Sequence, residues 1–308
     1  MLEVSILCYH GIIKDTPPGF NSSGKHLNVE KFENQMSFLA KNFEIVSMQN
    51  IENYFLGQGS LPKKSIAITF DDGYANNLWI AHPILEKHGL KATIYLATGY
   101  IDSPKIMWSD RLELALIQSK ITQFEIMLDK IHYFDLSNLA NKLDTLKSIK
   151  SYIKKANPEI NNKILDAVDQ KLEIDKNLTI PLIHRFLEWE DVRFMNSTNV
   201  WDIGAHTEDH YSLGTLAPSD GIKQIKNSLL KVKTELAYDG YPLFSYPEGR
   251  NFDIPGYAIQ FLTSIGFNTA PSANPGKNYI TRFSSKNAMK LKRYLVGFEN
   301  LDFPWNVF

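Results

Sequence analysis

Short apolar runs alternate with segments of helical spacing along most of the chain. The runs are rich in β-branched residues and bounded by turn residues, which is typical of buried strands. The intervening segments carry apolar residues three or four positions apart, as in residues 28–42, where Phe32, Met36 and Leu39 share one face. Strands that alternate with helices in this way predict a parallel sheet covered by helices. The predicted strands are residues 4–9, 43–48, 65–70, 91–97, 200–205, 242–247, 266–271 and 293–298.

Seven or eight strand–helix units favour a barrel over an open sheet, and we expect residues 1–308 to form a single domain. Residues from about 103 to 182 break the pattern, because they are rich in Lys, Asn, Leu and Ile and show few strand signals. We interpret them as a helical insertion after the fourth strand, either a cap over the strand ends or a decoration without a role in the site. Trp108, near its start, is expected to pack against neighbouring side chains rather than to line a cleft.

Composition limits the class of protein. The net charge is −1 with no long run of one sign, so nothing indicates a nucleic-acid partner or an anionic membrane surface. No stretch approaches the roughly 20 apolar residues that a membrane helix needs, and the first residues lack the basic leader of a signal peptide. We therefore expect a cytoplasmic protein without a membrane span, and its oligomeric state leaves no mark on the sequence. The single cysteine, Cys8, excludes an intramolecular disulfide.

Two adjacent carboxylates, Asp71 and Asp72, follow the predicted strand at residues 65–70. Active sites of parallel α/β barrels lie at the C-terminal ends of the strands, because the loops converge there. The sequence Asp-Asp-Gly is also common in turns, so the pair alone does not establish a site.

Two histidines, His206 and His210, follow the predicted strand at residues 200–205. If the segment is a helical turn, the two imidazoles face the same way with an axial separation of about 6 Å, which suits chelation of one metal ion. The alternative is a pair of surface histidines at the start of a helix. Because both follow a buried strand, we expect them at the same rim as the aspartates, and two imidazoles plus one carboxylate are a common ligand set of catalytic zinc.

Three motifs, in the order TFDDGY, HTEDH and FSYPEG, resemble the successive motifs of the polysaccharide deacetylase family, also known as the NodB-homology domain or carbohydrate esterase family 4. Similar stretches run from LCYHGI near the start to GFNTAPSANPGKN near the end, so the resemblance covers nearly the whole chain except the insertion. It implies a deformed (β/α)7-type barrel, one divalent metal ion with zinc as first choice, and removal of N-acetyl groups from an amino sugar or glycan.

The resemblance also implies a role for each motif residue. Asp71 would be the general base that takes a proton from water, and the backbone N–H of Glu248 would help to hold the tetrahedral oxyanion. The expected metal ligands are Asp72, His206 and His210, and the expected substrate-binding residues are Tyr246, Pro247 and Glu248.

The sequence departs from the family at two positions. Many members carry an arginine that orients the base, but Ser245 stands there, so Arg250 or another cation would have to replace it. Many members also carry a late histidine as general acid, and no histidine follows His210. Either Asp71 returns the proton that it took, or His10, at the end of the first predicted strand, donates one. The alternative for His10 is a packing role at the barrel mouth.

The leading hypothesis is therefore a metal-dependent hydrolase that acts on an N-acetylated amino sugar within a glycan or glycoconjugate. One alternative is a related amidohydrolase for formamides or ureides on small molecules. Another is a carbohydrate-binding protein that kept the barrel and lost activity. The complete ligand set and Asp71 argue against the second alternative.

Overall fold

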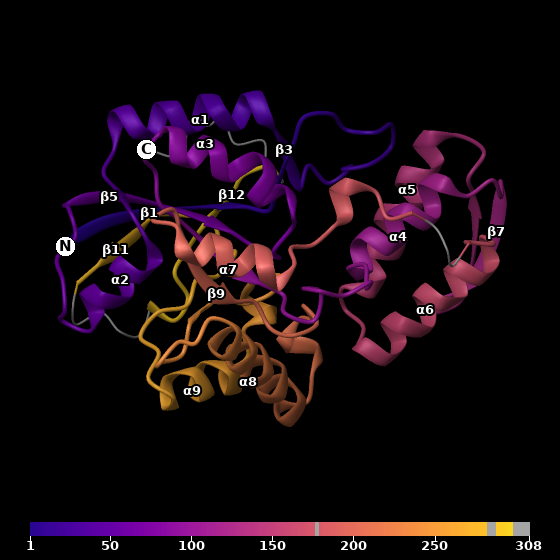
Figure 1. The fold of residues 1–308 in the computed structure, drawn as a ribbon. Helices are drawn as coiled ribbons and strands as arrows, with labels where there is room; N and C mark the ends of the chain where they lie inside the picture. Colours follow the sequence, from indigo (N-terminus) through magenta and orange to yellow (C-terminus); the bar gives the residue numbers. More distant parts are fainter. Residues whose placement is uncertain (176–178, 282–287, 298–308) are drawn as a thin grey trace.

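The computed structural model describes residues 1–175, 179–281 and 288–297 (Figure 1). An eight-stranded sheet lies at its centre, in the order β10-β9-β6-β5-β1-β11, with β12 also pairing with β1 and β4 with β5. All of these pairs are parallel except that of β11 with β1. The parallel strands curl into a half-barrel, which confirms the predicted α/β class and deformed barrel. The strands are β1 (Leu2–Tyr9), β4 (Ile45–Val46), β5 (Lys64–Phe70), β6 (Ala92–Leu96), β9 (Trp201–Ala205), β10 (Leu243–Phe244), β11 (Asn278–Ile280) and β12 (Tyr294–Leu295).

Helices cover both sides of this sheet, with α1 and α3 together on one side and α8 and α9 on the other (Figure 1). Helix α1 begins at Asn28, whose side chain accepts hydrogen bonds from two backbone N–H groups of the first turn, and it buries the predicted apolar face. A short parallel pair, β2 (Gly11–Ile13) and β3 (His26–Asn28), lies beside the N-terminal strand. The helices are α1 (Val29–Asn42), α2 (Met48–Phe55), α3 (His82–Lys87), α7 (Trp189–Ser197), α8 (Pro218–Glu235) and α9 (Gly256–Ser264), with single turns at Asn77–Ala81, Leu182–His184, Leu213–Thr215 and Asn251–Asp253.

The central strands are buried on both faces. Ile68 and Phe70 of β5 pack into the main core with the helices, while Ala67 of the same strand packs into a second cluster with Tyr95. Burying an apolar side chain of this size stabilises the fold by about 1.5–3 kcal/mol. The core therefore fixes the strand ends, where the polar residues of interest follow.

The predicted strand at residues 266–271 is wrong. After α9 the chain turns at Gly266, whose φ is 100°, and only Pro271 forms an isolated bridge, to Leu291. The backbone N–H of Asn268 donates instead to Glu52 Oε1 at 3.0 Å, so a buried carboxylate satisfies the group that a strand neighbour would bind. The last predicted strand, 293–298, is present as β12, and residue 298 lies outside the described residues.

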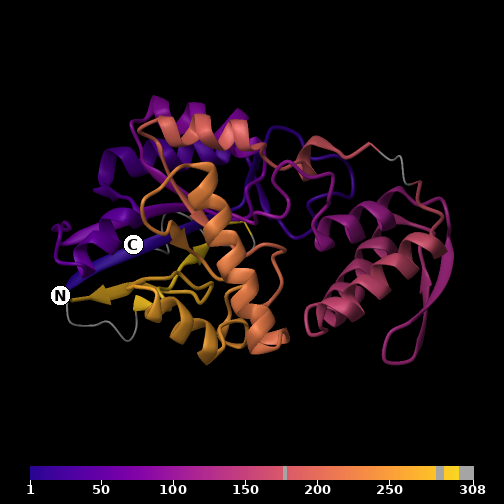
Figure 2. The same cartoon turned by 60° about the horizontal axis from the view of Figure 1, so that its bottom comes forward.

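The region of the predicted insertion stands to one side of the sheet (Figures 1 and 2). It contains the expected helices and also an antiparallel hairpin, which the sequence pattern did not reveal. In β7 only Phe124 and Ile126 are buried, so the strand follows a period of two over too few residues to be distinguished from a loop. The region has a hydrophobic cluster of its own. Its elements are α4 (Trp108–Gln118), β7 (Gln123–Met127), β8 (Ile131–Asp135), α5 (Leu139–Ile153) and α6 (Pro158–Lys171).

A bilayer-spanning helix is absent from residues 1–175, 179–281 and 288–297, since none of the helices there is both long and apolar enough.

Candidate active site

The ends of two parallel strands bring the expected metal ligands together. Asp72 follows β5, while His206 and His210 follow β9, and only β6 separates these strands in the sheet. His210 Nε2 lies 3.2 Å from Asp72 Oδ1, and His206 Nε2 lies 3.8 Å from the same oxygen. All three side chains are buried. The candidate ligand atoms lie within 4.8 Å of one another, as donors to a single cation must.

The prediction of a helical turn between the two histidines is wrong. Residues 206–210 form a loop, in which Thr207 and His210 have φ values of 62° and 56°. Asp72 also lies in this left-handed region, with a φ of 76°. Non-glycine residues rarely adopt it, and such conformations gather at functional sites. The centroids of the two imidazole rings are 4.9 Å apart. The loop conformation, with its left-handed residues, brings the rings together, and no helical turn is involved.

The ligand group fits a divalent cation. Asp72 Oδ1 is buried, and its polar neighbours among the described residues are the Nε2 atoms of His210 and His206, at 3.2 and 3.8 Å, so a cation between these three atoms would satisfy all of them. His206 Nδ1 lies 2.9 Å from the backbone oxygen of Ser245, a contact that holds the proton on Nδ1 and leaves Nε2 as the donor to a metal. Burial lowers the pKa of His206 to about 4, so this imidazole is neutral, as a metal ligand must be.

The second carboxylate, Asp71, has a different partner. Arg293 donates two hydrogen bonds to it, from Nη1 to Oδ1 at 2.8 Å and from Nη2 to Oδ2 at 2.7 Å. Both groups are buried, and Arg293 also donates from Nε to the backbone oxygen of Ser272 at 2.8 Å. Burial raises the pKa of Asp71, but the charge and hydrogen bonds of Arg293, together with the charges of His206 and His10, outweigh it and lower that pKa to about 2. Asp71 is therefore ionised at neutral pH and held in one orientation.

Arg293 supplies the cation that Ser245 does not provide. Arg250, the candidate that the sequence offered, lines the cavity, but the residue that binds Asp71 is Arg293. Arg293 precedes β12, which pairs with β1 through Leu7 and Cys8 and so lies beside the end of β5. No motif marked this arginine, since its role depends on a strand pairing between the two ends of the chain.

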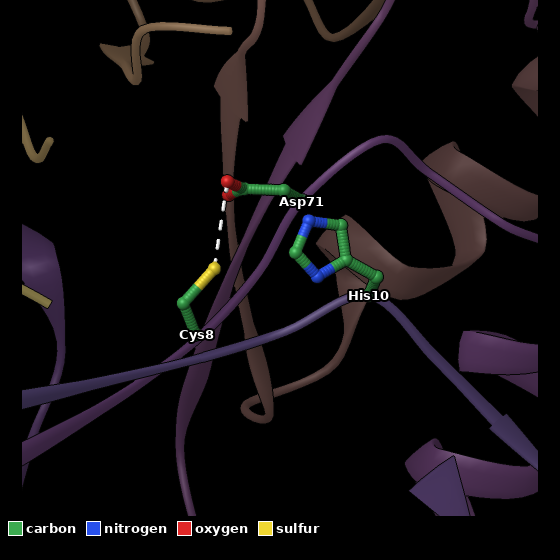
Figure 3. A group of neighbouring side chains, drawn as sticks. All are labelled: Cys8, His10 and Asp71. Atoms are coloured by element: carbon green, nitrogen blue, oxygen red, sulfur yellow. Dashed lines mark hydrogen bonds between the residues drawn. The ribbon is translucent and has the colours of Figure 1, made fainter. Parts of the chain in front are cut away.

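Cys8 and His10 lie next to Asp71 (Figure 3). Cys8 Sγ donates a hydrogen bond to Asp71 Oδ2 at 3.5 Å, and burial raises the pKa of the thiol well above its usual range. His10 lines the cavity, and burial lowers its pKa. The structure thus places His10 at the site, at the end of β1, as the sequence analysis expected for either of its two roles.

The third motif contributes two of its three expected residues to the cavity. Tyr246 and Glu248 are among the lining residues, whereas Pro247 is buried in the turn and is not. Glu248 has a φ of 57°, and its carboxylate accepts a hydrogen bond from Lys154 of the insertion at 2.9 Å. The turn is close-fitting, because a Cβ at Gly249 would lie 2.7 Å from the backbone nitrogen of Ala273.

One cavity of about 350 Å³ connects the candidate metal ligands with the groups around Asp71. Its lining includes His10, Asp71, Asp72, His206, His210 and Arg293. The insertion supplies part of its wall through Trp108, Lys150 and Lys154, so this segment covers the strand ends. Trp108 packs against neighbouring hydrophobic residues, as expected, and also lines the cavity, which was the alternative. Asp110, two residues later, is buried and bonded to Lys25 instead.

Comparison with known proteins gives a family. The family model described as polysaccharide deacetylase matches residues 58–270, which is more than half of the chain. The protein YxkH of Bacillus subtilis, whose name places it among polysaccharide deacetylases, is 38% identical over 97 residues, which are 30% of this chain and 32% of that protein.

Solved structures share the fold. A deacetylase of Streptococcus pyogenes, PplD, whose structure contains acetate, aligns over 97% of this chain and 94% of its own with a TM-score of 0.60 at 16% identity. IcaB of Ammonifex degensii aligns over 96% of this chain and 92% of its own, with a TM-score of 0.59 at 16% identity. At this identity the likeness is one of fold alone.

Proposed function

Because the chain belongs to the polysaccharide deacetylase family, we propose that it is a metal-dependent hydrolase that removes N-acetyl groups from an amino sugar in a glycan or glycoconjugate. One observation carries the proposal. Asp71 lies beside the group formed by Asp72, His206 and His210 but is held by Arg293, so one carboxylate is available to a cation and the other to a proton.

The roles of the chain's own residues follow from this division. A divalent ion held by Asp72, His206 and His210, with zinc as our first choice, would polarise the amide carbonyl and make water more acidic. Asp71 accepts the proton of the attacking water, in an orientation that Arg293 fixes. The backbone N–H of Glu248 is our candidate donor to the developing oxyanion. Tyr246 and Glu248 line the space in which the sugar would lie.

The departing amine must be protonated, and two groups could do this. Asp71 could return its proton, or His10, which lies beside Asp71 in Figure 3, could donate one. Burial lowers the pKa of His10, so a proton on the imidazole is given up readily, but a smaller fraction of the side chain carries that proton at neutral pH.

Replacing His10 by alanine should lower turnover by about a hundredfold, the usual contribution of a general acid, and leave the bound metal unchanged. Metal analysis and steady-state kinetics on the same preparation measure both effects. His132→Ala is the matched control, because His132 lies on the hairpin of the insertion and does not line the cavity. Unchanged turnover in His10→Ala would leave Asp71 as the proton donor.

The experiment that tests the proposed function measures bound metal and the acid released. The purified protein should bind one divalent ion per chain and release acetate from N-acetylglucosamine oligomers or from nucleotide- or lipid-linked amino sugars. Chelation should stop the release, and adding the ion back should restore it. His210→Ala should lower metal affinity about a hundredfold or more, since it removes a direct ligand.

The outcomes separate the three hypotheses of the sequence analysis. Acetate release that follows metal content supports the deacetylase. Formate release from N-formylated amino sugars, without acetate release from the N-acetylated ones, supports the related amidohydrolase. Bound metal without release of any acid supports the binding protein, and absence of metal affinity contradicts the site itself.

A further inference from the structure

Lysines line the wall of the cavity that faces the insertion. Lys150 lies in α5 and Lys154 is the C-cap residue of that helix, so the two are one turn apart and lie on the same side. Lys25, which precedes β3, lines the same cavity. We call Lys25, Lys150 and Lys154 the lysine wall.

Two members of the lysine wall have carboxylate partners and the third has none among the described residues. Lys25 lies 2.5 Å from Asp110, and Lys154 lies 2.9 Å from Glu248. Lys150 forms no ion pair with any described residue. Burial lowers the pKa of Lys150, and the nearby charge of Lys25 lowers it further. Lys150 is half-buried, so its ammonium group is partly desolvated at the cavity and is available to an anion that enters it.

Two carboxylates near Lys150, those of Asp110 and Glu113, do not face the cavity. Asp110 and Glu113 of α4 are buried and are absent from the cavity lining. Glu113 is already occupied, because it accepts hydrogen bonds from the backbone N–H groups of Asn21 and Ser22 at 3.2 Å. These two charges lie behind the wall and partly compensate it, whereas Glu248 lines the cavity and is paired with Lys154. Lys150 is therefore the ammonium group of the wall that has no carboxylate partner among the described residues.

The N-terminal end of α4 adds positive electrostatic potential to this side of the cavity. Trp108 and Ser109, the first two residues of this helix, line the cavity, and the N-cap residue Met107 offers no capping side chain. The positive end of a helix dipole thus lies beside the lysines. Lys150 lies one helical turn from Lys154, whose charge Glu248 already pairs, so an anion in the cavity would find Lys150 as its unpaired partner in this helix.

We propose that the lysine wall binds an anionic substituent, a phosphate or a carboxylate, on the amino sugar whose amide lies at Asp71 and Asp72. This inference rests on the proposed function for the identity of the sugar, and it narrows the substrate class to negatively charged amino sugars. The cavity, of about 350 Å³, contains both the amide-cleaving group and the lysine wall, so one small molecule can reach both.

The test compares binding of a neutral and two anionic ligands, without turnover. The probes are N-acetylglucosamine, N-acetylglucosamine 1-phosphate and N-acetylmuramic acid, measured by titration calorimetry on the metal-loaded Asp71→Asn protein. At least one anionic probe should bind about tenfold more tightly than the neutral sugar, and the phosphate and carboxylate arms show which anion is preferred. Raising the salt concentration should weaken only the anionic probes.

Variants assign the effect to Lys150. In the same Asp71→Asn background, Lys150→Gln should remove about tenfold of the preference, and Lys150→Arg should retain it. Lys147→Gln is the matched control, since Lys147 lies on the same helix with 79% of its side chain exposed, and it should change nothing. If Lys150→Gln fails to fold, the salt dependence of the parent and the Lys150→Arg result still decide the matter.

Two failures are distinguishable. Equal binding of neutral and anionic probes, no binding of either anion, or an equal loss in Lys147→Gln would overturn the inference, even if the protein releases acetate. Charge-selective binding that depends on Lys150, in a protein that releases no acid, would support the lysine wall and contradict the proposed hydrolase.

Discussion

Asp71→Asn should reduce turnover at least about a thousandfold while bound metal stays near the parent level. The asparagine amide is isosteric with the carboxylate but cannot accept the proton of the attacking water, and general-base catalysis is worth about 10²–10⁴ in rate. Metal content should persist because Asp72, His206 and His210 are untouched. The measurement is turnover and metal per chain on one preparation.

The control for this prediction is Asp144→Asn. Asp144 has 79% of its side chain exposed on α5 and pairs only weakly with Lys147, so its loss should affect neither quantity. Turnover within tenfold of the parent in Asp71→Asn would remove Asp71 as the base. Loss of the metal together with turnover would instead mean that Asp71 is a ligand, and the division between the two aspartates would be wrong.

Arg293→Met should lower the free energy of unfolding by about 3–5 kcal/mol, the usual cost of removing one partner from a buried ion pair. The cause is Asp71, which would keep its burial and lose both hydrogen bonds from the guanidinium. Urea denaturation of the metal-free protein measures the change. The double variant Asp71→Asn, Arg293→Met should recover a large part of the loss, because no buried charge is left without a partner.

The same pair makes stability depend on pH with a known sign. The pKa of Asp71 is about 2 in the folded protein, against an ordinary value of 3.8. The stability that this carboxylate contributes is therefore complete above pH 4 and is lost as the pH falls from about 4 to 2. In Arg293→Met the guanidinium no longer opposes burial, and only the charges of His206 and His10 still lower the pKa of Asp71. This pKa should therefore rise, and less stability should be lost as the pH falls from about 4 to 2. An acid dependence identical to that of the parent would contradict the assignment of the shift to Arg293.

Much of the site could be predicted because it depends on local rules. Asp71 and Asp72 follow one apolar strand and His206 follows another, and parallel strands deliver such residues to one edge. The reason given for His206 and His210 was nevertheless wrong, since a reversing loop rather than a helical turn joins them. Pattern alone did not distinguish these backbones, because both place residues four apart near each other.

Other parts could not be predicted, because they depend on contacts between distant segments. Arg293 meets Asp71 only through the pairing of β12 with β1, and neither strand carries a signal for the other. Lys150 lies in a segment that reads as an ordinary amphipathic helix, and its position at the cavity depends on how that segment packs. Residues that would select the substrate, such as Lys150, are therefore harder to predict from one sequence than the metal ligands.

The hydrogen bond from Cys8 to Asp71 gives the protein a built-in reporter. Cys8 is the sole thiol of the chain and is fully buried, so a thiol reagent can reach it only when β1 separates from its neighbours. The rate of its modification in native buffer would thus measure the opening of β1 beside Asp71, the proposed base. The measurement needs no introduced label, and a ligand that closes the cavity should lower the rate of Cys8 modification.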